Sequence, residues 1–161
     1  MDDETTKEQA EHYFHKGYAA QMKGDLDEAI ACYRKSIECC PTAEAHTFLG
    51  WTYSFKGDYE AAIRECQIAI EVDPDFGNPY NDIGAYLIEL GWYEEAIPWL
   101  KKAMEAKRYE PRHYPHTNLA RVYVKRGKIH DAVRELKRAL EMEPEYKRAA
   151  TELHRLLGML N

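Results

Sequence analysis

Two histidines in the second half of the chain have a spacing that could support metal chemistry. His113 and His116 are three residues apart, so a helix could place both side chains on one face. No acidic or cysteine ligand stands beside them in the sequence, and we interpret them as polar residues that open a helix. Glu94 and Glu95 are adjacent carboxylates in an inter-helix turn, where helix capping explains them. With no HExxH, nucleophile elbow or phosphate-binding loop, we expect no metal, no cofactor and no enzymatic activity.

The four cysteines are the other reactive side chains. They are Cys32, Cys39, Cys40 and Cys66, and no two of them form a CxxC motif. Cys66 falls at a core position of a helix, and Cys39 and Cys40 are adjacent at a helix end. We interpret all four as reduced thiols, and a redox or disulfide role is the alternative.

A glycine pattern that recurs along almost the whole chain indicates which elements hold these residues. The first anchors lie 33, 34 and 36 residues apart, at Gly17, Gly50, Gly84 and Ala120. Seven residues after each anchor comes a glycine, at Gly24, Gly57, Gly91 and Gly127. Five residues later comes an alanine with an aliphatic neighbour, at Ala29-Ile30, Ala62-Ile63, Ala96-Ile97 and Ala132-Val133. A repeat of this length predicts an array whose units bury their apolar faces by stacking.

Each unit is expected to form two helices. In the second unit the apolar positions follow the three- and four-residue spacing of an amphipathic helix, at Leu49, Tyr53, Ala62, Cys66, Ala69 and Ile70. Gly57 can adopt the left-handed conformation that ends the first helix, and Asp58 can cap the second. The small anchor residues should lie where the two helices cross. A proline ends every unit but the third, at Pro41, Pro74 and Pro144.

On these residues the chain resembles the tetratricopeptide repeat family, whose repeat of 34 residues carries Leu-Gly, Tyr, Ala and Pro at set places. The Leu-Gly pair is matched by Leu49-Gly50 and Ile83-Gly84, and the Tyr by Tyr53 and Tyr123. The resemblance implies an all-α fold, an α-solenoid with the course of a right-handed superhelix. It also implies a single domain over residues 1–161, with four units at 10–42, 43–76, 77–110 and 113–146.

The ends and the third unit depart from the regular pattern. The third unit lacks the closing proline and has a longer connection, KRYEPRHYP, while Pro98 falls in the second turn of its second helix, where we expect a bend. Residues 147–160 predict a capping helix with apolar residues in register, at Ala150, Leu153, Leu156, Leu157 and Leu160. The first nine residues are polar and are expected to fray.

Composition and charge limit the class of protein. The chain is 45% hydrophobic and 31% charged, as in soluble globular proteins, and it has no apolar run of membrane-spanning length. We therefore expect a cytoplasmic protein that binds no membrane. Residues 1–76 carry 16 acidic and 7 basic side chains, and residues 77–161 carry 12 and 15. We interpret this asymmetry as a solvated helical surface; an acidic partner for the C-terminal end and head-to-tail self-association are the alternatives. The net charge of −6 argues against nucleic acid as a partner.

The resemblance also implies a binding groove lined by the first helices of successive units. The main groove positions that it assigns are Phe14, Tyr18, Trp51, Phe55, Asn78, Asn81, Tyr114, Arg121 and Lys125. Further groove positions are Glu11, Gln21, Met22, Glu44, Thr47, Ser54, Ala85, Ile88, Glu89, Thr117 and Val124. The aromatic residues would anchor a partner, and the alternative is that some of them only pack against the neighbouring unit.

The family resemblance permits one specific exclusion. Members that clamp the C-terminal carboxylate of heat-shock chaperones use Lys, Asn and Arg, but here those places hold residues such as Tyr18, Phe48 and Asp82. We therefore predict a non-catalytic adaptor or scaffold whose groove binds a peptide or helix of a partner protein. The alternatives are a self-associating structural module that forms homo-oligomers, and a non-catalytic accessory subunit of an enzyme complex.

Overall fold

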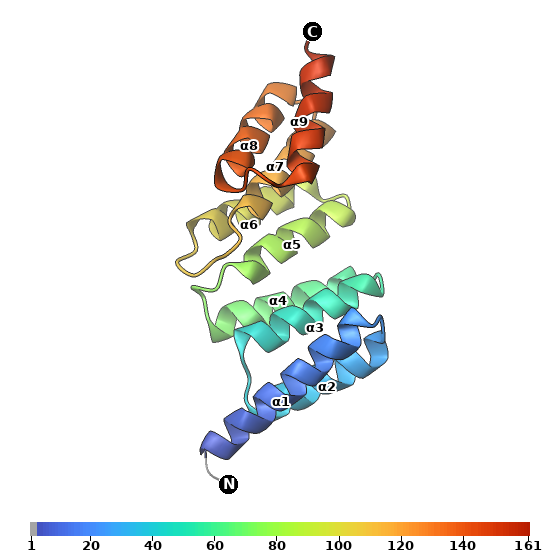
Figure 1. Cartoon of the computed structure of the whole chain (residues 1–161), viewed down its shortest axis with the longest axis vertical. Helices are drawn as coiled ribbons and strands as arrows, with labels where there is room; N and C mark the ends of the chain where they lie inside the picture. The colour runs from blue at the N-terminus through green and yellow to red at the C-terminus, as the bar shows by residue number, and fades with distance from the viewer. Residues whose placement is uncertain (1–2) are drawn as a thin grey trace.

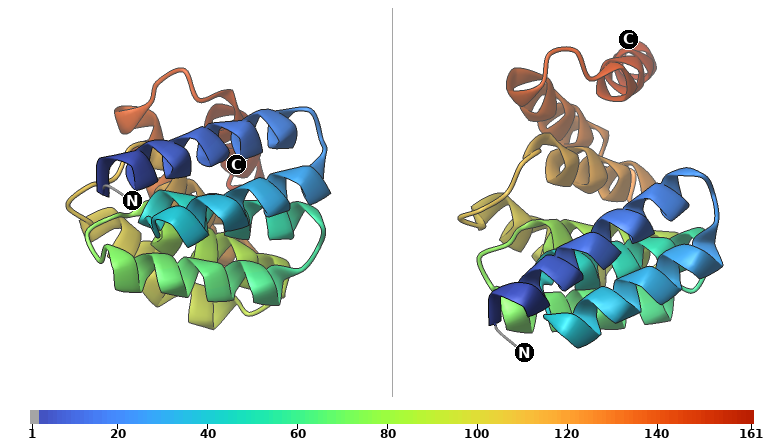
Figure 2. Two further views of the ribbon diagram at one scale, coloured as in Figure 1. Left: turned by 90° about the horizontal axis from the view of Figure 1, so that it is seen from below. Right: turned by 60° about the horizontal axis from the view of Figure 1, so that its bottom comes forward.

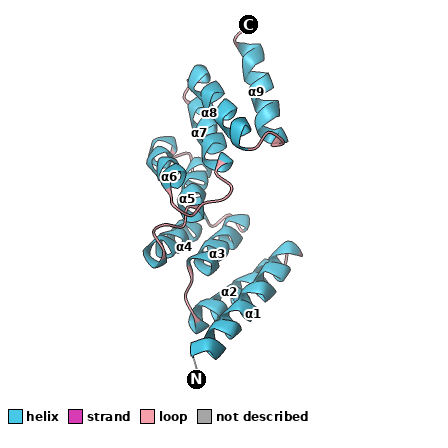
Figure 3. Cartoon of the chain, turned by 60° about the vertical axis from the view of Figure 1, so that its left-hand side comes forward, coloured by secondary structure: helices cyan, strands magenta, loops and turns pink. Residues whose placement is uncertain are grey.

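The computed structural model describes residues 3–161, and these form nine helices and no strand (Figure 1). The helices are α1 (Asp3–Met22), α2 (Leu26–Cys39), α3 (Ala43–Phe55), α4 (Tyr59–Val72), α5 (Asn78–Glu89), α6 (Tyr93–Glu105), α7 (His113–Lys125), α8 (Ile129–Met142) and α9 (Lys147–Met159). Short loops connect them, and the longest connection lies between α6 and α7 (Figure 3). The all-α prediction is confirmed.

The helices stack as successive antiparallel pairs. The most extensive contacts join α1 with α2, α3 with α4, α5 with α6, and α7 with α8. The first helices also contact one another in the order α1, α3, α5 and α7, while each second helix contacts the first helix of the next pair. The two termini therefore lie at opposite ends of the stack (Figures 1 and 2). This arrangement is the predicted α-solenoid.

The turn inside each pair has the predicted glycine geometry. Positive φ angles between 72° and 81° occur at the second glycine of all four units, Gly24, Gly57, Gly91 and Gly127. The carboxylates of Asp25 and Asp58 accept hydrogen bonds from backbone amides three residues later and cap α2 and α4. The capping predicted for Glu94 and Glu95 is wrong. Both lie inside the first turn of α6, whose cap residue Trp92 makes no side-chain bond, and Glu94 pairs with Arg126 instead.

Small residues lie where the paired helices cross, as predicted. A Cβ atom on Gly50 would stand 2.9 Å from the carbonyl oxygen of Ala62, and one on Gly84 would stand 2.4 Å from Leu100 Cδ2. The alanines of the second helices, Ala62 and Ala96 among them, are fully buried at these crossings. The backbones can approach this closely only because no larger side chain separates them.

The long connection between α6 and α7 is held against the corner between α4 and α5. The Arg108 guanidinium donates to Glu44 at 2.9 Å and to Asp73 at 2.6 Å, and it lies over the Phe76 ring at 4.4 Å. Its backbone carbonyl accepts from the Gly77 amide at 2.9 Å. α6 itself continues through Pro98, which lies in its second turn, and ends at Glu105. The departure of the third unit therefore produces a loop fixed by long-range contacts.

The two ends differ from the sequence-based expectation. α1 begins at Asp3, so the fraying predicted for the first nine residues is wrong from that residue on, while residues 1 and 2 lie outside the described chain. In α9 the residues that pack against α8 are Ala149, Leu153 and Leu156. Three other residues predicted for that apolar face are exposed, namely Ala150, Leu157 and Leu160. Within residues 3–161, no helix combines the length and the apolar character needed to cross a membrane.

Candidate functional site

Three clefts follow one another along the surface formed by the first helices, which we call the first-helix face. The first, of about 380 Å³, lies at α1 and α3 and includes Glu11, Phe14 and Glu44. The central cleft, of about 350 Å³, receives side chains from α3, α5, α7 and the α6–α7 connection. Its lining residues are Thr47, Phe48, Trp51, Asn78, Asn81, Asp82, Tyr109 and Tyr114. The third, of about 580 Å³, lies at α7, α8 and α9 and includes Arg121, Lys147 and Arg148.

A continuous row of aromatic rings joins the first two units on this face. Phe48 is its centre, with ring centroids 5.2 Å from Phe14, 5.9 Å from Tyr18 and 5.7 Å from Trp51. Trp51 in turn lies 5.1 Å from Phe55. These edge-on and tilted contacts hold the rings in place without burying the outer ones. We call Phe14, Tyr18, Phe48, Trp51 and Phe55 the aromatic row.

The aromatic residues assigned to the groove differ in exposure. Tyr18 is 43% exposed, Phe55 57% and Tyr114 40%, which is high for large apolar side chains. Trp51 is half-buried, belongs to none of the buried clusters among the described residues, and lines the central cleft. Phe14 is also half-buried, but it packs against the core of the first unit. Packing against the buried core therefore occupies Phe14 more fully than Trp51.

Two of the further groove positions are wrong because their side chains are buried in the interior. Gln21 is 5% exposed and accepts a hydrogen bond from the Tyr33 hydroxyl at 2.7 Å. Ile88 is 5% exposed and belongs to the largest buried cluster. Thr47 and Thr117 are also buried, with their hydroxyls bonded to carbonyls of their own helices, although both still border clefts.

A chain of polar contacts runs along the first-helix face from α7 to α5. Arg121 donates to Glu89 at 2.8 Å and to the Asn118 side-chain oxygen at 3.2 Å. The Asn118 amide donates to the Asn81 side-chain oxygen at 3.0 Å. The amide nitrogen of Asn81 is thereby directed away from Asn118, and the Asn81 side chain hydrogen-bonds to Asp82. The predicted groove residues Asn81 and Arg121 thus belong to one network.

Asp82 is the acidic residue that lines the central cleft, and its carboxyl has an unusually high pKa. Burial raises the pKa of its carboxyl from an ordinary value of 3.8 to about 7, while the hydrogen bond with Asn81 lowers it. Neutral groups surround it, because burial also raises the pKa values of the Tyr109 and Tyr86 hydroxyls and of the Cys66 thiol. The cleft therefore holds a carboxyl group that is readily protonated near neutral pH.

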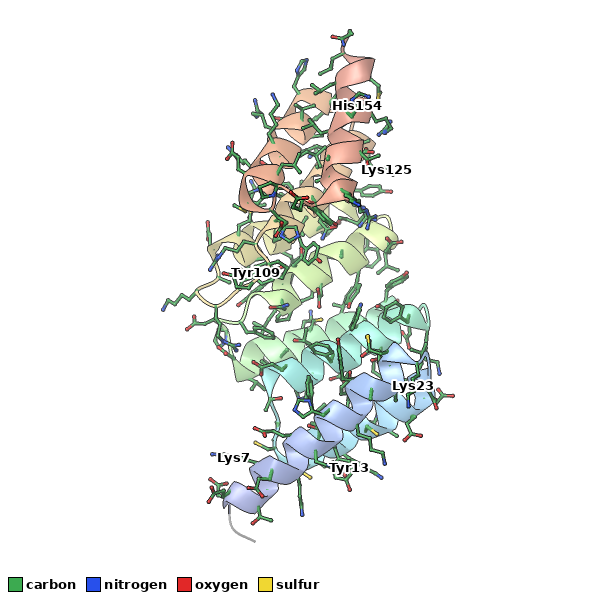
Figure 4. All side chains as sticks on the ribbon, in the orientation of Figure 1. Lys7, Tyr13, Lys23, Tyr109, Lys125 and His154 are labelled. Atoms are coloured by element: carbon green, nitrogen blue, oxygen red, sulfur yellow. The ribbon has the colours of Figure 1, made fainter. Side chains whose placement is uncertain are left out.

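Two of the main groove positions remain to be placed, Asn78 and Lys125. Asn78 borders the central cleft beside Asn81, and Lys125 is exposed at the end of α7 (Figure 4). Sequence reasoning did not assign three lining residues to the groove: Tyr109, and Phe48 and Asp82, which it named only at the places of a carboxylate clamp. The repeat frame places Phe48 and Asp82 on first helices and could have suggested them. Tyr109 lies in the irregular connection, where no repeat position applies (Figure 4).

The two histidines considered for metal chemistry are buried and point to different partners. His116 Nδ1 lies 2.6 Å from Glu135 Oε2, and the His113 ring lies 4.7 Å from the ring of Tyr146. Their interpretation as helix-opening polar residues missed the acidic neighbour, because Glu135 is on the next helix. The second unit has the same pair, with His46 Nδ1 2.7 Å from Glu65 Oε2. Within residues 3–161, no three His, Cys, Asp or Glu side chains gather as a metal site would require.

None of the four cysteines forms a disulfide in the described chain. Cys66 is fully buried at the helix crossing of the second unit. Burial raises the pKa of its thiol, which favours the unreactive protonated form. Cys32 is also buried, and the pKa of its thiol is likewise raised by burial. Packing in the core is a sufficient reason for cysteine at these two positions, and no redox role is needed to account for them.

Comparison with known proteins supports a repeat array. Family models described as tetratricopeptide repeat match residues 10–42, 43–76 and 75–145. The photosystem I assembly protein Ycf3 of Prochlorococcus marinus is 30% identical over 120 residues, which cover 68% of this chain and 69% of that protein. The solved structure of Pseudomonas aeruginosa PilF superposes with a TM-score of 0.89 at 25% identity, over 96% of this chain and 70% of that chain.

Other relatives are much longer than this chain. The small glutamine-rich tetratricopeptide repeat-containing protein 2 of Mycosarcoma maydis is 31% identical over 97 residues, which are 60% of this chain but only 28% of that protein. The type IV pilus assembly protein PilF of Pseudomonas aeruginosa matches 96% of this chain and is covered over 62% of its length. Family models, relatives and stacked helix pairs agree, and the chain belongs to the tetratricopeptide repeat family.

Proposed function

We propose that this chain is a non-catalytic interaction module that binds a segment of a partner protein along the first-helix face. The observation that carries the proposal is the central cleft, where three first helices and a loop contribute eight lining residues. A cleft assembled from separate units can contact several successive residues of an extended peptide. The aromatic row continues from it across the first two units and offers large apolar surface for anchoring.

The names of two relatives agree with this role. Ycf3 and PilF are both named as assembly proteins, of photosystem I and of the type IV pilus. We infer from them that this chain also brings protein partners together and performs no chemistry of its own. A cytoplasmic location and the absence of membrane and nucleic-acid binding remain predictions from composition.

A selection with randomised peptides tests the proposal directly. A library of displayed 12-residue peptides would be selected on the full chain, and the dissociation constants of enriched peptides would be measured for Trp51→Ala. We expect binding to weaken by about 2 kcal/mol or more, roughly 30-fold, because a half-buried aromatic on a cleft wall is a typical anchor. Thermal unfolding would be measured on the same samples, because loss of a core tryptophan would instead cost about 3–5 kcal/mol of stability.

Trp92→Ala is the matched control. Trp92 is 55% exposed, is the N-cap residue just before α6 and borders a crevice at α4, α5 and α6, away from the three clefts. Its replacement should leave peptide affinity unchanged. Equal effects of the two variants, or a large drop in stability with normal peptide binding for Trp51→Ala, would contradict the proposal. Light scattering over a range of concentration and salt would reveal the self-associating alternative.

A further inference from the structure

The central cleft combines aromatic walls with a single carboxylate. Phe48 and Trp51 line it from α3, Tyr109 from the α6–α7 connection and Tyr114 from α7. Asp82 stands among them on α5 and is half-buried. Tyr109 is only 3% exposed, so its ring is fixed by packing against the start of α5. Aromatic faces carry partial negative charge, so rings and carboxylate together favour a cation.

The basic side chains near this cleft are all engaged elsewhere. Arg121 is bound to Glu89 and Asn118, and Arg108 to Glu44 and Asp73. Arg112 donates to the carbonyls of Met104 and Ala106 at the end of α6. In the described chain no Lys, Arg or His forms an ion pair with Asp82, and its carboxyl hydrogen-bonds to the Asn81 side chain. The carboxylate of the cleft therefore has no counter-ion of its own.

We propose that the central cleft receives an arginine side chain of the partner, with the guanidinium stacked on the aromatic walls and paired with Asp82. This inference rests on the proposed function of the first-helix face. Arginine fits better than lysine because its planar guanidinium stacks on rings and bonds a carboxylate through two N–H groups. A carboxylate or phosphate is disfavoured, because Asp82 lines the cleft and none of the lining residues in the described chain carries a positive charge.

The surrounding amides agree with a peptide as the source of the arginine. Asn78 borders the same cleft and its amide can bond a peptide backbone, which has both donors and acceptors. The third cleft, next along the face, carries Arg121, Lys147 and Arg148. The third cleft also contains Glu152, and its Arg121 is already paired with Glu89, but its lining keeps more basic than acidic side chains. It therefore favours an arginine less than the central cleft does, where Asp82 is the charged side chain of the lining.

Binding of a cation should depend on pH through Asp82. The titratable groups that face it are Cys66 on α4, Tyr86 on α5, Tyr109 on the connection and Tyr114 on α7, while α3 contributes only Thr47, Phe48 and Trp51. Burial raises the pKa values of Cys66, Tyr86 and Tyr109, so these groups stay neutral below pH 8. Arginine pairs with the ionised carboxylate, and its affinity should fall as the pH decreases from 8 to 6.

The test uses three versions of the full chain and displayed 12-residue peptides. Wild type, Asp82→Asn and the control Glu71→Gln, which removes an exposed carboxylate on α4, would each be used for selection at pH 8. We expect an arginine enriched at one peptide position for wild type and Glu71→Gln but not for Asp82→Asn. For a selected peptide, replacement of that arginine by the neutral isostere citrulline should weaken binding at least tenfold with wild type and less than twofold with Asp82→Asn. Asp82→Asn keeps the side-chain shape, and its fold is checked by thermal unfolding.

The outcomes separate this inference from the proposed function. Peptides that depend on Trp51 but carry no arginine, or that bind Asp82→Asn as tightly as wild type, would overturn the inference and leave the first-helix face intact as a binding surface. Enrichment of lysine or of a free amino terminus would overturn the assignment to arginine. Selection of no peptide sensitive to Trp51→Ala would overturn both.

Discussion

At the scale of single residues, Asp82 is a side chain whose ionised form lowers the free energy of unfolding. Its carboxyl lies in a mostly apolar cleft without a counter-ion, and burial raises its pKa to about 7. Burying an ionised carboxylate costs free energy, which a purely structural position would avoid by carrying Asn or Leu. Residues that are unfavourable for the fold often serve binding, because the partner supplies the missing contact.

This cost predicts how stability depends on pH. The pKa of Asp82 is higher in the folded state than its ordinary value of 3.8, so the native state binds more protons than the unfolded state between about pH 4 and 7. The contribution of Asp82 to the free energy of unfolding should therefore decrease as pH rises through this window, by roughly 1–3 kcal/mol because the half-buried carboxyl is partly solvated. Urea unfolding at pH 5 and pH 8 would measure the change.

Asp82→Asn isolates that contribution from the other titrating groups. The variant should be more stable than wild type at pH 8, and the difference should shrink towards pH 5. A constant difference between the two proteins across this range would show that Asp82 is solvated in the folded chain.

At the scale of the helix pair, one contact between the two helices is made by different types of side chain in different units. A first-helix residue meets a second-helix residue 19 positions later as His46 with Glu65, and as His116 with Glu135. In the third unit the same spacing places the ring of Tyr80 beside the ring of Trp99. The three units thus bring the same two helix positions together, through a polar contact in the second and fourth units and an aromatic contact in the third.

The crossing itself tolerates little added volume. Gly50→Ala would place a Cβ atom 2.9 Å from a backbone oxygen on α4, which cannot move as a side-chain end can. We expect a loss of about 1–3 kcal/mol in the free energy of unfolding, the usual range for overpacking. Chemical denaturation with analysis of the midpoint and slope measures it.

Gly158→Ala provides the control for helix propensity. Gly158 lies in α9, and a Cβ atom there would meet nothing within 4 Å. That substitution should leave stability unchanged or raise it by up to about 1 kcal/mol. If Gly50→Ala behaved in the same way, the close approach of α3 and α4 would be refuted.

At the scale of the whole molecule, the fourth helix pair is packed against α9. α9 contacts α8, and its Ala149 and Leu156 belong to one buried cluster with Val133 and Leu136 of α8. In a linear array each unit is stabilised mainly by its neighbours, so an uncovered end exposes apolar surface. We therefore propose that α9 acts as the capping helix.

Removal of residues 147–161 should destabilise the C-terminal pair and promote aggregation. Size-exclusion chromatography with light scattering would detect the aggregates, and hydrogen exchange would locate the loss of protection in α7 and α8. A shortened chain that remains monomeric with unchanged protection would disprove the capping role.

Two neighbouring leucines of α9 provide a finer comparison. Leu156 is fully buried and Leu157 is 40% exposed. Leu156→Ala should cost about 2–5 kcal/mol of stability, and Leu157→Ala should cost much less. Similar losses would mean that the helix packs through a different face.

The repeat architecture could be predicted from the order of the residues alone. Glycine, alanine and proline at fixed intervals specify where helices turn, cross and end, and these are local properties of the backbone. The positive φ angles at Gly57 and its equivalents, the cap at Asp58 and the stacked helix pairs were therefore predictable. The first-helix positions of Trp51 and Asn81 followed from the same frame.

The surroundings of those positions could not be predicted in this way, because they depend on contacts between elements that are distant in the sequence. The burial that raises the pKa of Asp82 is contributed by neighbouring elements, and Tyr109 reaches the central cleft because Arg108 binds Glu44, 64 residues away. Similarly, the packing face of α9 was misread at Leu157 and Leu160, because the apolar stripe alone does not show how a helix rotates against its neighbour. Periodicity describes one helix at a time, whereas the environment of a side chain depends on residues distant in the chain.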